Sequence, residues 1–162
     1  MAGKYGDSKM TEEKKKWTKE NAAGGVVFKR DQSQTFVLMV NPKGPNFGPP
    51  QPYWTWPKGL IDREGENKEE TAVREVKEEA GVNAKILKPL GYVKFFQGFR
   101  NVIKFVDFYL MEYESGDPSD HDEEIANVEW VLIDEAESRL KFKHDKEILE
   151  RAKIILPSCV IL

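Results

Sequence analysis

The sequence predicts an α/β domain in which a β-sheet is covered by helices on both faces. Three observations lead to this prediction: apolar runs of strand length, an amphipathic helix over Lys68–Ala80, and a second amphipathic helix over His144–Leu156. Because strands are mixed with a central and a terminal helix, each helix needs an apolar sheet face to pack on. The 162 residues suffice for one domain with a real core.

The composition narrows the classes of protein to which the chain can belong. With 28 acidic and 25 basic residues, the net charge of -3 gives no support for nonspecific nucleic-acid binding, and we expect no stable nucleic-acid complex. The single cysteine excludes an intramolecular disulfide and fits a reducing compartment. The N-terminus is charged, unlike a secretory signal. We expect a cytoplasmic protein that is a monomer or a homodimer.

The chain divides into a tail, a domain and a short apolar end. Residues 1–20 are rich in Lys, Glu, Ser and Gly, so we expect a flexible charged tail before a domain at 21–156. In the apolar end, 157–162, the last four residues from Cys159 fit the C-a-a-X prenylation pattern. Only two basic residues lie nearby and no apolar run approaches the roughly 20 residues of a membrane span, so we expect no membrane attachment. We expect this end to pack on the domain or on a dimer partner.

The first elements are predicted to be strands separated by a long loop. Asn21–Arg30 reads as a core strand whose paired glycines allow close approach by a ligand, and Thr35–Val40 as a strand buried on both faces. Asn41–Tyr53 contains five prolines and two glycines, which excludes regular structure. We expect this loop to face substrate, with Lys43 placed to meet a phosphate, although an ordinary surface loop fits the same composition. Trp54–Trp56 is expected to be a short strand that delivers Lys58 and Gly59 to a loop.

The central helix combines an acidic arc and an apolar arc. At about 100° per residue, Glu75, Glu78 and Glu79 fall within roughly 100° of each other. The apolar arc, centred roughly 120° away, contains Ala72, Val73, Val76 and Ala80. Three clustered carboxylates repel unless a cation neutralises them, and oxygen ligands favour Mg²⁺ or Mn²⁺. Gly81 is expected to end the helix in a left-handed conformation.

The second half predicts further strands and two helices. The expected strands lie within Ala84–Phe96, where Pro89–Gly91 breaks the pattern, and at Val102–Tyr113 and Val128–Ile133. An acidic loop precedes the last strand. Asp134 is expected to cap a short helix before the final helix.

The central residues resemble a family motif. Gly59, Glu66 and the run Arg74-Glu75-Val76-x-Glu78-Glu79-x-Gly81-Val82 are similar to the Nudix box, G-x5-E-x7-R-E-U-x-E-E-x-G-U with U apolar. The match departs at its front, where six residues instead of five separate the glycine from the first glutamate. The resemblance extends over roughly 21–156. It implies the Nudix α/β/α sandwich, with a mixed β-sheet between helices.

The resemblance implies a metal site and catalytic roles. Glu75 and Glu79 would be the firmest ligands of Mg²⁺ or Mn²⁺, and Glu78 a ligand or the base that activates water. The Gly59 carbonyl often binds the metal in this family. Glu66 would support the ligands or reach the metal through water, and Arg74 would orient a carboxylate. Some members use a further catalytic glutamate, for which Glu124 is the candidate, and an acidic surface loop is the equal alternative.

Within the family, the chain looks most like the dinucleoside polyphosphate hydrolases, especially the diadenosine tetraphosphate type. By this resemblance Lys58 would meet substrate phosphate, and Phe142, flanked by Lys141 and Lys143, would stack on adenine. Core packing is the alternative for Phe142. Lys143 and Lys43 complete the expected substrate-binding set.

These expectations combine into a function. The chain is predicted to be a Nudix hydrolase that uses a divalent metal to cleave a phosphoanhydride bond in a small nucleotide, such as diadenosine tetraphosphate. Alternatives within the class are an RNA 5′-pyrophosphohydrolase, a diphosphoinositol polyphosphate phosphohydrolase and a nucleoside triphosphate pyrophosphohydrolase. The alternative from another class is a non-catalytic Nudix ligand-sensing module, which the complete set of glutamates disfavours.

Overall fold

The computed structural model describes residues 16–159, with side chains to residue 157. The strands are β1 (Thr18–Asp31), β2 (Gln34–Pro42), β3 (Lys58–Leu60), β4 (Val82–Gln97), β5 (Val102–Gly116) and β6 (Ile125–Leu132). The α-helices are α1 (Lys68–Ala80), α2 (Ile133–Arg139) and α3 (Lys143–Cys159). Short 3₁₀ turns are η1 (Pro45–Phe47), η2 (Gly98–Arg100) and η3 (Pro118–Asp120).

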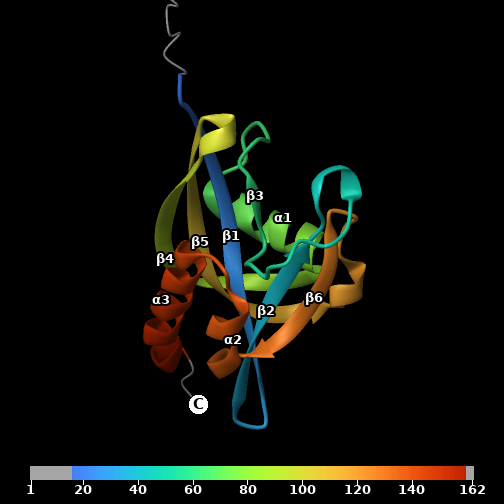
Figure 1. Ribbon diagram of the computed structural model, residues 1–162. Helices are drawn as coiled ribbons and strands as arrows, with labels where there is room; N and C mark the ends of the chain where they lie inside the picture. The colour runs from blue at the N-terminus through green and yellow to red at the C-terminus, as the bar shows by residue number, and fades with distance from the viewer. Residues whose placement is uncertain (1–15, 160–162) are drawn as a thin grey trace, which may run out of the picture.

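The strands form one mixed sheet. Its order is β4-β5-β1-β2-β6, with β3 paired to β1 beside this path. The pairing of β1 with β5 is parallel and the other pairings are antiparallel. Helix α1 lies on one side of the sheet and α2 with α3 on the other (Figure 1). The predicted α/β/α sandwich with a mixed sheet is confirmed.

The sheet separates two apolar cores because successive side chains of a strand point to opposite faces. In β2, Val37 and Met39 pack with α3, whereas Leu38 and Val40 pack with α1. All four side chains are buried, as predicted for a strand covered on both faces. The same alternation in β1 and β5 gives each helix a continuous apolar surface.

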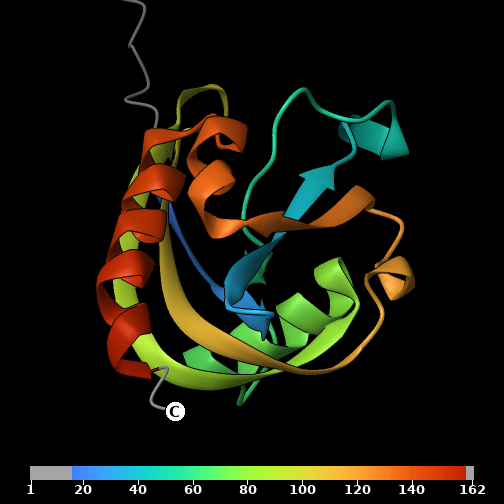
Figure 2. The same ribbon diagram turned by 90° about the horizontal axis from the view of Figure 1, so that it is seen from below.

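Strand β4 serves both cores because it bends. It contributes Val82 and Ala84 to the α1 core, and Leu90 and Val93 to the α3 core. Register shifts around residues 83–91 interrupt its pairing with β5, and such bulges curve a strand. Figure 2 shows the resulting curve, in which one stretch of β4 lies beside α1 and another beside α3. The expected break at Pro89–Gly91 is therefore a bulge inside one continuous strand.

Helix α1 has the predicted bounds because local signals fix both ends. The Asn67 side chain accepts a hydrogen bond from the Glu70 backbone N–H at 2.8 Å, and Gly81 has φ +78° as the left-handed cap. Ala72, Val76 and Ala80 are fully buried. Val73 was predicted to be buried with them, but it is 38% exposed because it lies at the edge of this stripe.

Several predicted strand positions are wrong. Thr18–Glu20, expected in the tail, pair with β5, so β1 begins before the predicted domain boundary. Trp54–Trp56 is not a strand and makes isolated bridges at Trp54 and Thr55; β3 begins at Lys58 instead. The paired glycines of β1 allow close approach by other parts of the protein. A Cβ on Gly24 would overlap the Pro57 carbonyl oxygen, and a Cβ on Gly25 would lie 2.7 Å from Met111 Sδ.

The C-terminal helices also differ from the prediction. Helix α2 begins at Ile133 with no side-chain cap, so Asp134 lies in its first turn instead of capping it. Helix α3 is longer than expected, with Ile148, Leu149 and Ala152 fully buried. No helix in residues 16–159 is long and apolar enough to cross a membrane. The predicted flexible tail lies almost wholly outside the described residues, and so do the Cys159 side chain and residues 160–162 of the C-a-a-X pattern.

Candidate active site

The acidic face of α1 is organised by Arg74. Its guanidinium makes two-point contacts with Glu66, with Nε at 2.9 Å from Oε2 and Nη2 at 2.9 Å from Oε1. Its Nη1 donates to Glu75 Oε1 at 2.8 Å and to Glu78 Oε2 at 3.1 Å. The Arg74 side chain is only 14% exposed, so these charge-assisted bonds hold three carboxylates in place. These contacts are compatible with the orienting role of Arg74, which stays a prediction.

Glu66 belongs to this support. Hydrogen bonds from Arg74 and then Thr71 hold the pKa of Glu66 at about 2, well below its ordinary value, so the carboxylate is ionised. The Thr71 hydroxyl donates to Glu66 Oε1 at 2.7 Å. Glu66 therefore fits the supporting role better than direct binding of a metal.

Gly59 meets the acidic face despite the additional residue that follows it. A Cβ at Gly59 would overlap the Glu75 carboxylate, so only glycine allows β3 to pass this close to α1. The intervening turn is exposed, and Gly65 within it has φ +77° with open space around its Cβ position. The longer segment therefore projects outward at residues 62–65 and leaves Gly59 beside Glu75.

Glu79 is the most desolvated carboxyl group of α1. Burial raises the pKa of Glu79 to about 8, an effect that the Lys58 charge and backbone bond only partly oppose. Glu79 Oε1 accepts the Lys58 backbone N–H at 2.9 Å. Burial also raises the pKa of Glu75, against the opposing effect of Arg74. A cation would relieve the cost of ionising both groups.

The donor chemistry of this face fits a hard divalent cation. Glu75, Glu78, Glu79 and the Gly59 carbonyl would supply oxygen ligands only. In the described part of the chain, no three acidic, histidine or cysteine side chains converge closely enough to hold an ion, since Arg74 draws Glu75 and Glu78 to itself. Binding would therefore require those carboxylates to turn from Arg74.

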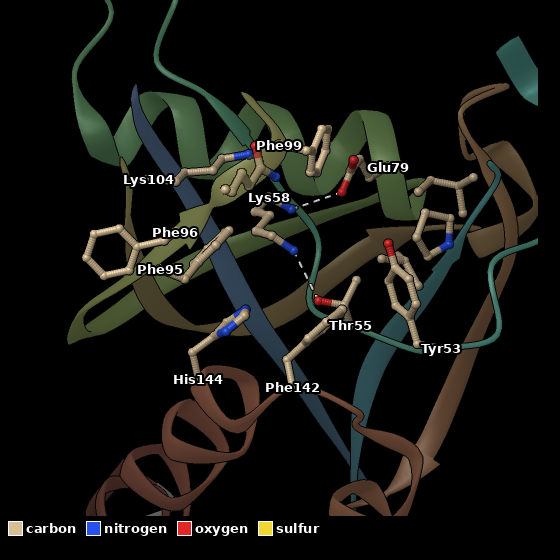
Figure 3. A pocket seen from close by; sticks show the side chains of 15 residues that line it. Tyr53, Thr55, Lys58, Glu79, Phe95, Phe96, Phe99, Lys104, Phe142 and His144 are labelled. Carbon is tan, nitrogen blue, oxygen red and sulfur yellow. Dashed lines mark hydrogen bonds between the residues drawn. The ribbon is translucent and has the colours of Figure 1, made fainter. Parts of the chain in front are cut away.

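A cavity of about 620 Å³ opens beside Glu79. Figure 3 shows aromatic rings from separate parts of the chain around it. His144 stacks on Phe95 with ring centroids 4.4 Å apart and on Phe142 at 5.3 Å. Tyr53 meets Phe142 edge to face at 4.9 Å. This arrangement of flat apolar surfaces suits the face of a nucleobase.

Two lysines lie in the same cavity. Lys58 Nζ donates to Thr55 Oγ1 at 3.0 Å, and Thr55 donates in turn to the buried Asp145 at 2.7 Å. Burial, followed by repulsion from Lys58, lowers the pKa of Lys104 below its ordinary value. An anion that enters the cavity would stabilise both ammonium groups, and this combination of lysines and aromatic rings suits a nucleotide.

A second cavity, of about 540 Å³, shares Glu79 with the first as a lining residue. Its walls include Lys43, Phe47 and Gln51 from the proline-rich loop, together with Glu124. The Lys43 backbone N–H donates to the Glu124 carbonyl at 2.9 Å and so ties the loop to the start of β6. Lys43 and Glu124, both predicted from the sequence, therefore share a cavity that reaches Glu79.

Most of the predicted site residues lie on the acidic face of α1 or line one of the two cavities, but Lys143 does neither. Lys143 is exposed at the start of α3 and is absent from the walls of both cavities. Lys141 instead lies over the Tyr53 and Phe142 rings, at 5.7 and 5.6 Å from their centroids. Sequence reasoning missed Tyr53 and Phe95, for which adjacency to the proline-rich loop and the Phe95–Phe96 pair were the available signals.

Comparison with known proteins identifies the family. A family model for the NUDIX domain matches residues 18–152. The chain belongs to the Nudix family. Among solved structures, an Ap4A hydrolase complex from C. elegans superposes on this Nudix fold with a TM-score of 0.70 at 23% identity, covering 86% of this chain and 98% of that one.

Three curated relatives have a higher sequence identity to this chain than that solved structure. A putative mutator protein MutT4 from Mycobacterium tuberculosis is 43% identical over 141 residues, covering 82% of this chain and 54% of the relative. An 8-oxo-(d)GTP phosphatase from Mycolicibacterium smegmatis is 32% identical over 148 residues, covering 89% and 44%. An asymmetrical bis(5′-nucleosyl)-tetraphosphatase from Sus scrofa is 30% identical over 153 residues, covering 85% and 95%. The chain thus spans about half the length of the two mycobacterial relatives and nearly all of the porcine one.

Proposed function

We propose that this Nudix chain is a divalent-metal-dependent hydrolase that cleaves a phosphoanhydride bond in a dinucleoside polyphosphate such as diadenosine tetraphosphate. The observation that carries the proposal is the aromatic and basic cavity that opens beside Glu79. The rings of Phe95, Phe142 and His144 offer stacking surface for a nucleobase. Lys58 lies between that surface and Glu79, and Lys104 lines the same cavity. A base held there would place its phosphates beside the acidic face.

The side chains of the site would have different roles in hydrolysis. When bound, a divalent ion would supply neutralisation of phosphoryl oxygens and activation of water. Glu75 and Glu79 are the proposed ligands, with Glu78 and the Gly59 carbonyl beside them. Without the ion, Arg74 holds Glu75 and Glu78 through its fork of donors, and those two carboxylates would turn from it to the ion. Lys58 would hold a phosphate, and its ammonium is positioned for this by Thr55.

Two glutamates are candidates for the base that takes a proton from water. Glu78 lies on α1, where Arg74 and Arg63 hold its two oxygens at 3.1 Å each. Glu124 is exposed and lines the second cavity, which Glu79 also lines. Loss of turnover with intact metal binding would identify the base, since loss of a ligand weakens both.

A nucleoside triphosphate is the second candidate substrate. It is favoured by the 43% identity with a relative described as a putative mutator protein and by the match to an 8-oxo-(d)GTP phosphatase. The porcine tetraphosphatase favours the dinucleotide, because the similarity covers 95% of that relative. The whole length of the mycobacterial relatives is not represented in this chain.

A substrate panel tests the proposal. With Mg²⁺ or Mn²⁺, kcat/KM should be highest for diadenosine tetraphosphate, and chelation should abolish turnover. The panel should also contain 8-oxo-dGTP, unmodified nucleoside triphosphates, triphosphorylated RNA and diphosphoinositol phosphates. Higher kcat/KM for 8-oxo-dGTP would establish the second candidate, and turnover of triphosphorylated RNA alone would refute both.

A further inference from the structure

The second cavity lies outside the group of aromatic rings that would hold one nucleoside. Glu79, Pro42 and Ile125 line both cavities, so the two spaces adjoin at the acidic residue. The first cavity already offers a stacked group of aromatic rings. A substrate with a single base would leave the second cavity unused, whereas a substrate with two bases has a second base to accommodate.

The second cavity contains an exposed aromatic side chain held in an uncommon backbone conformation. Phe47 is 58% exposed, although a phenyl ring is ordinarily buried. Asn46 and Phe47 have φ +56° and +53°, in the left-handed region that a bulky residue rarely adopts. Such backbone strain persists only where the surroundings impose it, and it occurs preferentially at ligand sites.

Backbone hydrogen bonds impose this conformation from both ends of the loop. Gly44 N–H donates to the Pro49 carbonyl at 2.9 Å, and Gly48 N–H donates to the Pro45 carbonyl at 3.1 Å. Gln51 N–H donates to the Pro42 carbonyl at 2.8 Å. The loop therefore holds Phe47 in place at the cavity, with little ordering left to be done when a ligand binds.

The polar groups around Phe47 match the hydrogen-bonding groups of a nucleoside. The Gln51 amide both donates and accepts, and the Glu124 carboxylate accepts from an amino group or a ribose hydroxyl. The Lys43 ammonium is the cation among the residues that line this cavity. Because Glu79 and Glu124 are acidic, the cavity suits a nucleoside better than a chain of phosphates without a metal ion.

We propose that this second cavity binds the distal nucleoside of a dinucleoside polyphosphate, with Phe47 stacking on the base of that nucleoside. The inference rests on the proposed dinucleoside polyphosphate hydrolase function and extends it. One nucleoside occupies the cavity of Phe142 and His144, the phosphates pass Glu79, and the other nucleoside occupies the cavity of Phe47. Phe47 would thereby distinguish dinucleotides from mononucleotides.

The experiment compares two substrates that differ only in the second nucleoside. Diadenosine tetraphosphate and adenosine 5′-tetraphosphate carry the same phosphates, so their KM ratio measures the contribution of the distal nucleoside. Phe47→Ala should raise KM for the dinucleotide about 5- to 150-fold, the range of base–aromatic stacking, with KM for the mononucleotide unchanged. Phe47→Trp should restore the preference, because indole retains a stacking face.

Two further variants separate binding from folding. Phe47→Gly should raise the same KM without lowering Tm, because glycine adopts positive φ without strain. Tyr92→Ala is the matched control, since Tyr92 is also 58% exposed and lines neither cavity. It should change neither KM.

The outcomes distinguish this inference from the function on which it rests. If wild-type protein hydrolyses the dinucleotide and Phe47→Ala leaves its KM within about twofold, the second subsite is refuted and the proposed function stands. An equal rise of KM for both substrates refutes the subsite as well. If wild-type protein does not turn over the dinucleotide, the proposed function fails and the subsite falls with it.

Discussion

Glu79 lies where the two cavities meet, and its carboxyl is the group for which substitution gives the sharpest test. Glu79→Gln should lower kcat by about 100-fold or more through loss of a metal ligand. The fold should be retained, because the amide oxygen can still accept the Lys58 backbone N–H and a neutral side chain removes the cost of burying charge. Activity assays and thermal unfolding of the same preparation check both parts. Near-normal turnover would refute the ligand assignment.

His144 should make stability depend on pH. Its ring lies against Phe95 and Phe142, and burial lowers the pKa of His144 below its ordinary 6.5, opposed by Asp145 and reinforced by Lys58. Between the two pKa values the unfolded chain binds more protons than the folded one, so stability rises with pH there. The contribution of His144 to the free energy of unfolding should therefore be fully present above about pH 6.5 and be lost below it. The raised pKa of Glu79 acts in the opposite direction and lowers stability as pH rises toward about 8.

Denaturation in urea between about pH 5.5 and 7.5 measures this dependence. The charged groups that act on His144 are Asp145, Lys58 and Glu147, and they remain in a His144→Gln variant. The slope attributable to the imidazole should disappear in that variant. A slope that persists unchanged would assign the dependence to other groups, and an NMR titration of His144 would give its pKa directly.

At the scale of elements, the contact of β3 with α1 depends on Gly59. Gly59→Ala should displace the Glu75 carboxylate, because the added methyl would occupy its position, and kcat should fall at least about tenfold. Gly65→Ala is the matched control. It adds a methyl group in open space at φ +77°, a conformation that alanine disfavours. The variant should therefore lose about 1 kcal/mol of stability while kcat stays unchanged. Circular dichroism melts and steady-state kinetics of both variants make the comparison, and equal kcat values would contradict it.

The elements also show which signals in the sequence are local. Helix α1 was predicted to its residue bounds because its signals are local: the apolar spacing lies within it and Gly81 directly follows it. Strand β3 was missed because it exists through its pairing with Ala22–Gly24, which is distant in sequence. The side-chain stack at Phe95 is likewise tertiary, since α3 brings His144 to β4. Lys143 was misplaced because its direction at the start of α3 depends on how that helix packs.

At the scale of the whole molecule, a metal that binds only the folded state should stabilise it. Mg²⁺ or Mn²⁺ at about 100 times its Kd adds about 2.7 kcal/mol, which corresponds to a Tm increase of about 5–10 °C for a domain of this size. The increase should be largely lost in Glu79→Gln, and Ca²⁺ or K⁺ serves to test ion specificity. Scanning calorimetry with and without chelator measures the effect. An equal increase in Glu79→Gln would place the ion elsewhere.

The outward turn at residues 62–65 has a consequence for how such chains are found and altered. Its two flanks are fixed, by Gly59 against Glu75 and by Glu66 against Arg74, while the peptide between them faces solvent. A change in the length of this segment would leave Gly59 and Glu66 in place and would reach the acidic face through Arg63, which bonds Glu78. Searches that demand a rigid spacing will therefore overlook genuine members. Because the turn at residues 62–65 is exposed, it is a suitable site for inserting a reporter peptide.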